Sequence, residues 1–216
     1  MTPHIHPQLP IVLIGAMGSG KSHVGECLAQ KLDVLFIDTD GRVEAEHGLI
    51  SEIFERHGEG YFRALEREAV AAAITEPAVV SLGGGAVLDP LTQDRLRGLP
   101  VVWLQVSEGV AASRLQGSNR PLLATGGIDR WREILAERMS IYDECARLRV
   151  DTSGRSVPQI VREIMAGLAL AAPIGRVMAG QGVTASGQGP AVSEHSGTVS
   201  GHGERQSATS GARESV

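Results

Sequence analysis

The amino-acid sequence predicts an α/β fold built on a parallel β-sheet, and two observations carry that prediction. Short apolar segments recur along residues 10–172, with segments of helical spacing between them. The apolar segments are continuous, which is typical of strands covered on both faces. Strands that alternate with helices favour parallel pairing through right-handed crossovers. We therefore predict a three-layer α/β/α architecture with a five-stranded parallel sheet.

The individual elements follow from these patterns. The predicted strands are Ile11–Ile14, Val34–Ile37, Ala78–Leu82, Val101–Val106 and Leu148–Val150. The predicted helices are Ser22–Leu32, Glu59–Ile74, Arg130–Ala146 and Val157–Leu170. Apolar residues recur in them at helical spacing. Trp131 is one of these residues and is interpreted as a packing residue.

Glycine content separates a folded domain from a tail. Nine of the 27 glycines lie beyond Pro173, in a segment of small and polar residues that has no aromatic side chain. Such a segment offers no apolar stripe whose burial would offset the entropy lost on ordering. We predict an N-terminal arm over residues 1–9, a folded domain over 10–173 and a disordered Gly/Ser-rich tail over 174–216.

Charge and cysteine content exclude several classes of protein. The net charge is −5, without a basic block, which disfavours nucleic-acid binding. Cys27 and Cys145 form no CxxC motif, so neither a cysteine zinc site nor a disulfide framework is predicted. No apolar run approaches the roughly 18 residues of a membrane span, and no secretory signal is visible. We expect a cytoplasmic protein without nucleic-acid or membrane partners.

Residues Gly15–Ser22 match the phosphate-binding loop G-x-x-x-x-G-K-[ST]. They follow a predicted strand and open a predicted helix, which is the context that this motif requires. Glycines let backbone N–H groups surround phosphate oxygens, and the helix N-terminus favours an anion. Lys21 is expected to reach the β- and γ-phosphates, and the Ser22 hydroxyl to bind Mg²⁺. A glycine-rich turn with a surface lysine is the alternative.

Two carboxylates end the second predicted strand. Asp38 and Asp40 are two residues apart, so extended backbone would direct both to the edge where α/β sheets bind ligands. One carboxylate can hold Mg²⁺ through water, and the other can accept a proton from an attacking hydroxyl. The alternative is that Asp40 caps a short helix over Gly41–Glu46. The phosphate loop one strand earlier favours the functional interpretation.

Three further features are weak when each is taken alone. In Phe62-Arg63-x-x-Glu66, the arginine forms either a surface ion pair or an anion site that Glu66 holds in place. Gly83–Gly85 follows the third strand and is either a tight turn or a place where a ligand approaches the backbone. Arg120 lies in an ordinary loop or in a lid whose arginine neutralises phosphoryl charge.

Taken in order, these motifs resemble those of shikimate kinases, from about Ile11 to Leu168. The shared motifs are Gly15–Ser22, Asp38-Thr39-Asp40, Phe62-Arg63-x-x-Glu66, Ser81–Val87, Arg120–Leu123, Arg138 within Glu137–Tyr142, and Val150-Asp151-Thr152. The resemblance implies a P-loop kinase of the nucleoside-monophosphate-kinase-like fold, with a mobile lid. It implies ATP-dependent, Mg²⁺-requiring phosphorylation of the 3-hydroxyl of shikimate, a step of aromatic amino-acid biosynthesis.

The resemblance also implies a role for each matching residue. The catalytic residues would be Lys21, Asp40 and Arg120, and the metal would be held by Ser22 and Asp38. ATP would be bound by Gly18, Ser19, Gly20, Lys21, Ser22, His23, Arg120 and Arg155, the last near the adenine. Shikimate would be bound by Asp40, Arg63, Gly83, Gly84, Gly85 and Arg138, beside the apolar Phe54 and Phe62. We expect the enzyme to be a monomer.

The sequence departs from the family pattern at three places. His23 stands where threonine is common, and Gly48–Phe54 is one residue shorter than usual. Residues 107–120 are about one residue longer, so the adenine-side arginine there stays open, with Arg114 as a candidate. Two alternative functions are a kinase for another small polyol acid such as gluconate, and a nucleotide-binding module without catalysis.

Overall fold

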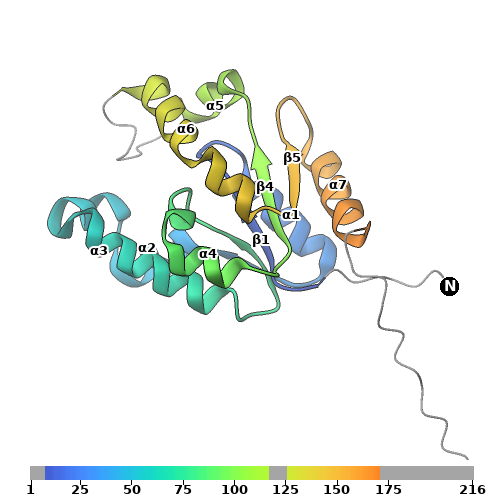
Figure 1. The fold of residues 1–216 in the computed structure, drawn as a ribbon, viewed down its shortest axis with the longest axis horizontal. Coiled ribbons are helices and arrows are strands. Elements are labelled where there is room, and N and C mark those ends of the chain that lie inside the picture. Colours follow the sequence, from blue (N-terminus) through green and yellow to red (C-terminus); the bar gives the residue numbers. More distant parts are fainter. Residues whose placement is uncertain (1–7, 117–125, 171–216) are drawn as a thin grey trace, which may run out of the picture. The chain divides into compact units, whose positions relative to one another are not determined.

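Five parallel strands form one sheet in the order β2-β3-β1-β4-β5, and helices cover both of its sides (Figure 1). The computed structural model describes residues 8–116 and 126–170. The strands are β1 (Ile11–Ile14), β2 (Leu35–Asp38), β3 (Ala78–Ser81), β4 (Val101–Gln105) and β5 (Leu148–Asp151). The predicted α/β fold with a five-stranded parallel sheet is confirmed, because each strand lies within one residue of its predicted bounds.

The helices agree less closely with the prediction. They are α1 (Lys21–Leu32), α2 (Thr39–His47), α3 (Ile50–Ala73), α4 (Pro90–Leu96), α5 (Glu108–Leu115), α6 (Gly127–Cys145) and α7 (Val157–Leu170), with a short 3₁₀ helix, η1 (Ala86–Leu88). The prediction missed α4 and α5, which are short and bury few side chains. Gly58, with φ 79° and ψ 170°, interrupts α3. The predicted helix Glu59–Ile74 is therefore only the part of α3 after this kink.

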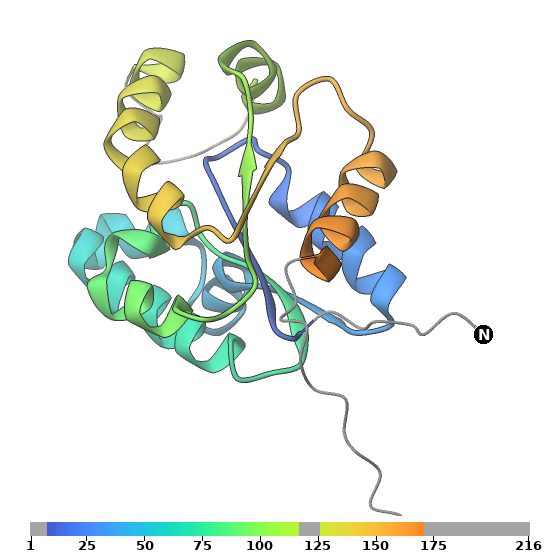
Figure 2. The same ribbon diagram turned by 45° about the vertical axis from the view of Figure 1, so that its right-hand side comes forward.

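Both faces of the sheet are buried, which explains why the strands are continuously apolar. On one face Val12 and Ile14 of β1 pack with buried residues of α3, α4 and α6. On the other face Ile11 and Leu13 pack with α1 and α7. Figure 2 shows α1 and α7 together on one side of the sheet. Alternate residues of one strand thus enter different cores, and each of them must be apolar.

Parallel register brings the carboxyl ends of the strands to one edge. Asp38 of β2 lies beside Ser81 of β3, and Gln105 of β4 lies beside Asp151 of β5. The segment Gly15–Ser22 follows β1, whose neighbours are β3 and β4. The phosphate loop therefore lies between the segments that follow β3 and β4, at the edge where α/β sheets bind ligands.

Three predicted features lie outside the described residues. They are residues 1–7 of the arm, the tail, and the lid segment around Arg120, because residues 1–7, 117–125 and 171–216 are not described. These features stay predictions. None of the described helices is both long enough and apolar enough to cross a membrane.

Candidate active site

A cavity of about 1130 Å³ lies at the carboxyl edge of the sheet and brings most of the predicted site residues together. Its walls come from the phosphate loop, from α1, α2, α3, α5 and α6, and from the start of α7. The predicted residues that line it are Gly18, Ser19, Gly20, Lys21, Ser22, His23, Asp38, Asp40, Phe54, Phe62, Arg63, Gly84, Gly85, Arg138 and Arg155. Gly83 is not among the residues that line the cavity, and Arg120 is outside the described residues.

The phosphate loop has the backbone that its glycines predict. Gly15, Gly18 and Gly20 have φ values of 142°, 80° and 88°, a region that other residues rarely adopt. The Lys21 ammonium donates to the carbonyl oxygens of Gly15 at 2.9 Å and Ala16 at 3.2 Å. The Ser19 hydroxyl is buried and has no hydrogen-bond partner among the described residues. The loop thus presents a polar concavity at the N-terminus of α1, as phosphate binding requires.

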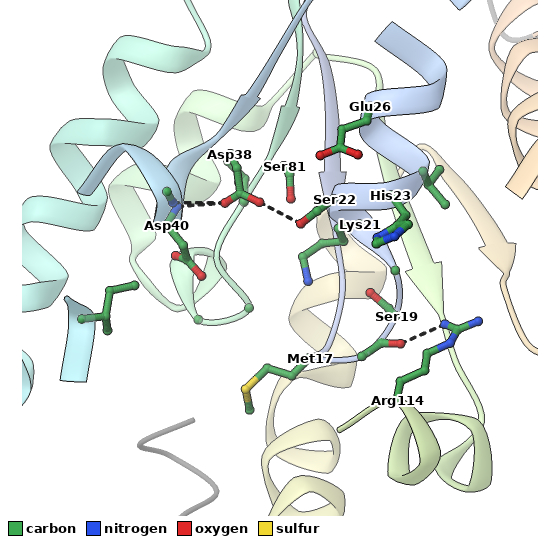
Figure 3. A pocket seen from close by; sticks show the side chains of 18 of the residues that line it. Met17, Ser19, Lys21, Ser22, His23, Glu26, Asp38, Asp40, Ser81 and Arg114 are labelled. Atoms are coloured by element: carbon green, nitrogen blue, oxygen red, sulfur yellow. Dashed lines mark hydrogen bonds between the residues drawn. The ribbon is translucent and has the colours of Figure 1, made fainter. Parts of the chain in front are cut away.

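Asp38 links the phosphate loop to the start of α2. One of its carboxylate oxygens accepts a 2.8 Å hydrogen bond from the Ser22 hydroxyl. The other accepts from the backbone N–H groups of Asp40 and Gly41, at 3.1 and 3.4 Å (Figure 3). Asp38 is therefore the N-cap of α2, and it reaches the phosphate loop at the same time.

This geometry corrects two expectations about the acidic pair. Asp40 does not cap a helix over Gly41–Glu46, because α2 already begins at Thr39. The backbone is also not extended from Asp38 to Asp40, since Asp40 lies in the first turn of α2. Both carboxylates nevertheless line the cavity. The helix start, rather than strand alternation, brings them there.

Ser22 and Asp38 are suited to hold a magnesium ion jointly with a nucleotide. They offer a hydroxyl and a carboxylate, which are the hard oxygen ligands that Mg²⁺ prefers. In the described part of the chain no three His, Cys, Asp or Glu side chains form a metal-binding group. Mg²⁺ commonly takes one or two protein ligands and completes its shell with water and substrate phosphates. This donor set therefore fits an ion that is bound together with phosphate.

Arg63 is half-buried and its partner Glu66 is buried, so the two do not form an ordinary surface ion pair. Arg63 donates to Glu66 at 2.6 Å and to Glu59 at 2.8 and 3.2 Å. Glu66 is only 3% exposed. Burial raises the pKa of the Glu66 carboxyl, and the positive charge of Arg63 opposes that shift. Since Asp40 is close enough to raise this pKa further, α3 brings an arginine and a carboxylate beside Asp40.

Arg138 of α6 approaches the same place from another element. It is 6% exposed, and its Nε has no hydrogen-bond partner among the described residues. One of its terminal nitrogens would lie 3.7 Å from a side chain added at Gly84. The positive charge of Arg138 also lowers the pKa of Glu66. A buried guanidinium with an unused donor at a cavity wall fits an anionic ligand.

Two of the three glycines after β3, Gly83 and Gly85, leave room for the charged groups of this site. A side chain at Gly83 would collide with the carboxylates of Asp40 and Glu66. A side chain at Gly85 would collide with the guanidinium of Arg63. The Gly83–Gly85 segment is thus more than a tight turn. It lets Asp40, Glu66 and Arg63 pack directly against the backbone.

Two arginines line the other end of the cavity. Arg114 donates to the Gly18 carbonyl at 2.9 Å and to the Thr152 carbonyl at 3.3 Å. Arg155 donates to the Asp151 carbonyl at 3.0 Å. From the sequence alone, Arg114 is only a candidate for the adenine-side arginine. In the structure, Arg114 lines the cavity. Among the sequence motifs, Thr152 appears only within Val150-Asp151-Thr152. No local pattern indicates that its hydroxyl contacts the phosphate loop.

One cavity holds the phosphate loop together with Asp40, Arg63 and Arg138. This combination defines a class of proteins, the P-loop kinases of small molecules. Comparison with known proteins narrows that class. A model of the shikimate kinase family matches residues 17–169. The chain is 47% identical over 163 residues to the shikimate kinase of Mycobacterium avium, covering 73% of this chain and 92% of that protein. It is 43% identical to that of Rhodococcus jostii, covering 73% and 96%.

Solved structures agree with the sequence comparison. The fold matches shikimate kinase from Acinetobacter baumannii in complex with shikimate, with a TM-score of 0.71 and 30% identity over 76% of this chain and 94% of that one. A deoxyadenosine kinase from M. mycoides, at a TM-score of 0.51 and 15% identity, shares the fold alone. The chain belongs to the shikimate kinase family. The predicted family and the predicted enzyme class, a phosphotransferase, are confirmed.

Proposed function

We propose that this enzyme transfers the γ-phosphoryl group of ATP to the 3-hydroxyl of shikimate. The observation that carries the proposal is the single cavity, which holds the phosphate loop at one end and the cluster of Asp40, Arg63 and Arg138 at the other. Transfer between two bound molecules requires both to lie in one site with their reacting atoms close. The two arginines, which phosphoryl transfer alone does not require, are explained by an acidic acceptor.

At the nucleotide end, the phosphate loop and Lys21 are proposed to bind the β- and γ-phosphates. Ser22 and Asp38 would hold Mg²⁺, which neutralises developing phosphate charge when bound. Arg120 is proposed to supply a further positive charge from the lid. The adenine side would be formed by Arg155 and Arg114, which both line that end of the cavity. His23 would contribute its backbone N–H from the first turn of α1.

At the acceptor end, Arg63 and Arg138 are proposed to bind the shikimate carboxylate. Gly84 would contact a ring hydroxyl through its backbone, with Phe54 and Phe62 as the apolar wall. These two rings pack together, with centroids 5.0 Å apart. Asp40 would hold the ring hydroxyls and accept the proton of the 3-hydroxyl as that oxygen attacks the γ-phosphorus. The bond to the β-phosphate oxygen then breaks, and ADP leaves.

The proposal extends to the setting in which the enzyme works. Each described residue assigned above comes from one chain and lines one cavity or its wall, which supports a monomeric enzyme. ATP and shikimate as small-molecule substrates support a cytoplasmic location. Sedimentation of the purified protein across a range of concentrations would reveal any assembly.

The test is a coupled assay of ADP release with ATP, Mg²⁺ and an acceptor. We expect turnover with shikimate and background rates with gluconate or without acceptor. Mass spectrometry of the product should show one added phosphoryl group on shikimate. Turnover with gluconate alone would favour the other small-acid kinase. ADP binding by calorimetry without turnover on either acid would favour a non-catalytic nucleotide-binding module.

A further inference from the structure

In the phosphate loop, each backbone carbonyl oxygen from Gly15 to Ser19 accepts a hydrogen bond from a side chain. Lys21 serves the first two, at Gly15 and Ala16. The next three carbonyl oxygens accept from side chains that are distant in the sequence. Trp131 Nε1 donates to Met17 at 2.9 Å and Arg114 donates to Gly18 at 2.9 Å. The Thr152 hydroxyl donates to Ser19 at 3.0 Å. The loop is therefore held through its carbonyl oxygens.

Holding a carbonyl also sets the direction of the next N–H. In a trans peptide the C=O of one residue and the N–H of the next point to opposite sides of the chain. A donor on the Met17 carbonyl therefore directs the Gly18 N–H the other way. Such inward-facing N–H groups make a phosphate-binding concavity.

The peptide between Met17 and Gly18 needs this restraint most. Gly18 has φ 80°, and glycine adopts positive and negative φ with similar ease. Without an external bond this peptide can rotate and turn its carbonyl toward the phosphates. Lys21 does not restrain it, because its bonds fall on Gly15 and Ala16. Arg114 and Thr152 act on the two peptides that follow.

Trp131 is well placed to provide the restraint. It lies in α6, 114 residues along the chain from Met17, and is only 2% exposed. It shares a small apolar cluster with Ala16 of the loop and Ala111 of α5. The cluster fixes the ring, so the indole N–H is presented in one direction.

We propose that Trp131 is a positioning residue for the nucleotide. Its indole N–H holds the Met17 carbonyl outward, so that the Gly18 N–H faces the phosphate site before ATP arrives. This preorganisation lowers the cost of ordering the loop on binding. The inference rests on the proposed nucleotide site.

The test compares two buried tryptophans, of which only Trp131 donates an indole hydrogen bond to the phosphate loop. Trp131→Phe removes the N–H that binds the loop. Trp103→Phe is the matched control, since Trp103 is 5% exposed and its Nε1 has no hydrogen-bond partner among the described residues. We expect calorimetry with Mg²⁺–ADP to show a dissociation constant about three- to tenfold higher for Trp131→Phe, the range expected for one lost hydrogen bond. Trp103→Phe should bind ADP as the unaltered enzyme does.

A second readout separates positioning from general loss of structure. The KM for ATP should rise in Trp131→Phe while the KM for shikimate stays within twofold, since a merely destabilised protein would lose both. ADP affinity within twofold of the unaltered enzyme, or equal losses in both variants, would overturn the inference. Failure of the unaltered enzyme to bind ADP would instead overturn the proposed function.

A third measurement keeps the inference testable if Trp131→Phe does not fold. In the unaltered enzyme labelled with ¹⁵N, the two indole N–H resonances are assigned by the loss of one in Trp103→Phe. We expect the Trp131 N–H to exchange slowly with water and to shift on addition of Mg²⁺–ADP but not of shikimate. Rapid exchange, or an equal response to both ligands, would contradict the proposed role.

Discussion

The Tyr142 hydroxyl donates a 2.5 Å hydrogen bond to the carbonyl oxygen of Gly84, at the centre of the three glycines after β3. Tyr142 is almost fully buried, and burial raises the pKa of its hydroxyl to about 12. The group therefore remains a protonated donor at physiological pH. Through this bond α6, which also carries Arg138, fixes the backbone of the proposed acceptor site.

Replacing Tyr142 by phenylalanine should weaken both the fold and acceptor binding. The variant removes the donor of the part-buried hydrogen bond to the Gly84 carbonyl, which costs about 0.5–1.5 kcal/mol of unfolding free energy. We expect urea denaturation to show this loss and kinetics to show a higher KM for shikimate, with the KM for ATP unchanged. Tyr61→Phe, on an exposed part of α3, is the control and should change neither quantity. An unaltered KM for shikimate would show that Tyr142 serves the fold alone.

Replacing Asp40 by asparagine should separate binding from chemistry. Asparagine is nearly isosteric but cannot accept the proton of the attacking hydroxyl, so kcat should fall about 100-fold or more. ADP binding by calorimetry should be retained, because the phosphate loop is intact. The exposed Asp94→Asn offers a matched control. A variant that keeps most of its kcat would exclude Asp40 as the proton acceptor.

Two arginines of α3 give a test of acceptor binding. Arg63 lines the cavity, whereas Arg67, one turn further along, pairs with Asp89 outside it. Arg63→Ala should raise the KM for shikimate roughly 10- to 100-fold, as expected for the loss of a charged hydrogen bond, while Arg67→Ala should leave it unchanged.

Because Arg63→Ala also removes the partner of buried Glu66, its unfolding free energy must be measured in parallel. Arg63→Lys keeps the positive charge and should recover part of that stability. Equal KM values in Arg63→Ala and Arg67→Ala would contradict the proposed role.

The buried Glu66 predicts a specific dependence of stability on pH. Its folded pKa is raised above the ordinary value of 4.5, chiefly by burial. The folded state then binds this proton more tightly than the unfolded state does. The corresponding stability is complete below about pH 4.5 and is lost as pH rises through the folded pKa.

Denaturation of Glu66→Gln beside the unaltered protein checks this sign. Because glutamine does not titrate, the unfolding free energy of the variant relative to the unaltered protein should increase as pH rises from 4.5 toward 7. The exposed Glu68→Gln is the control on the same helix. A difference that decreases over this interval would mean that Arg63 lowers the pKa of Glu66 more than burial raises it.

The sequence predicted the sheet and the phosphate loop well, because both depend on patterns of residues that are close together in the sequence. Ile11–Ile14 is apolar throughout since it enters two cores, and the loop motif has fixed spacing. The short helix α5 left no comparable pattern, because Ala111 is its one fully buried residue. The relation of Asp38 to Asp40 was misjudged because an aspartate at a strand end can cap a helix immediately.

Other parts of the site depend on contacts that no local pattern encodes. The bond from Trp131 to Met17 joins residues 114 positions apart, and Thr152 reaches Ser19 across 133. Spacing along the chain predicts neither contact. Arg63 and Glu66 were predicted as a pair, but only the fold shows that Glu66 is buried beside Asp40.

The kink at Gly58 divides α3 into two parts with different structural surroundings. After it, Val70 and Ala73 are fully buried against the sheet, so the position of Arg63 is tied to the core. Before it, Ile50 and Phe54 line the cavity, while Ile53 is the buried residue of that stretch. Changes before the kink can reshape the pocket without disturbing the sheet. New acceptor preferences within this fold should therefore arise between Ile50 and His57, whereas changes at buried or cavity-lining positions after the kink, such as Val70 and Arg63, should cost the enzyme its activity.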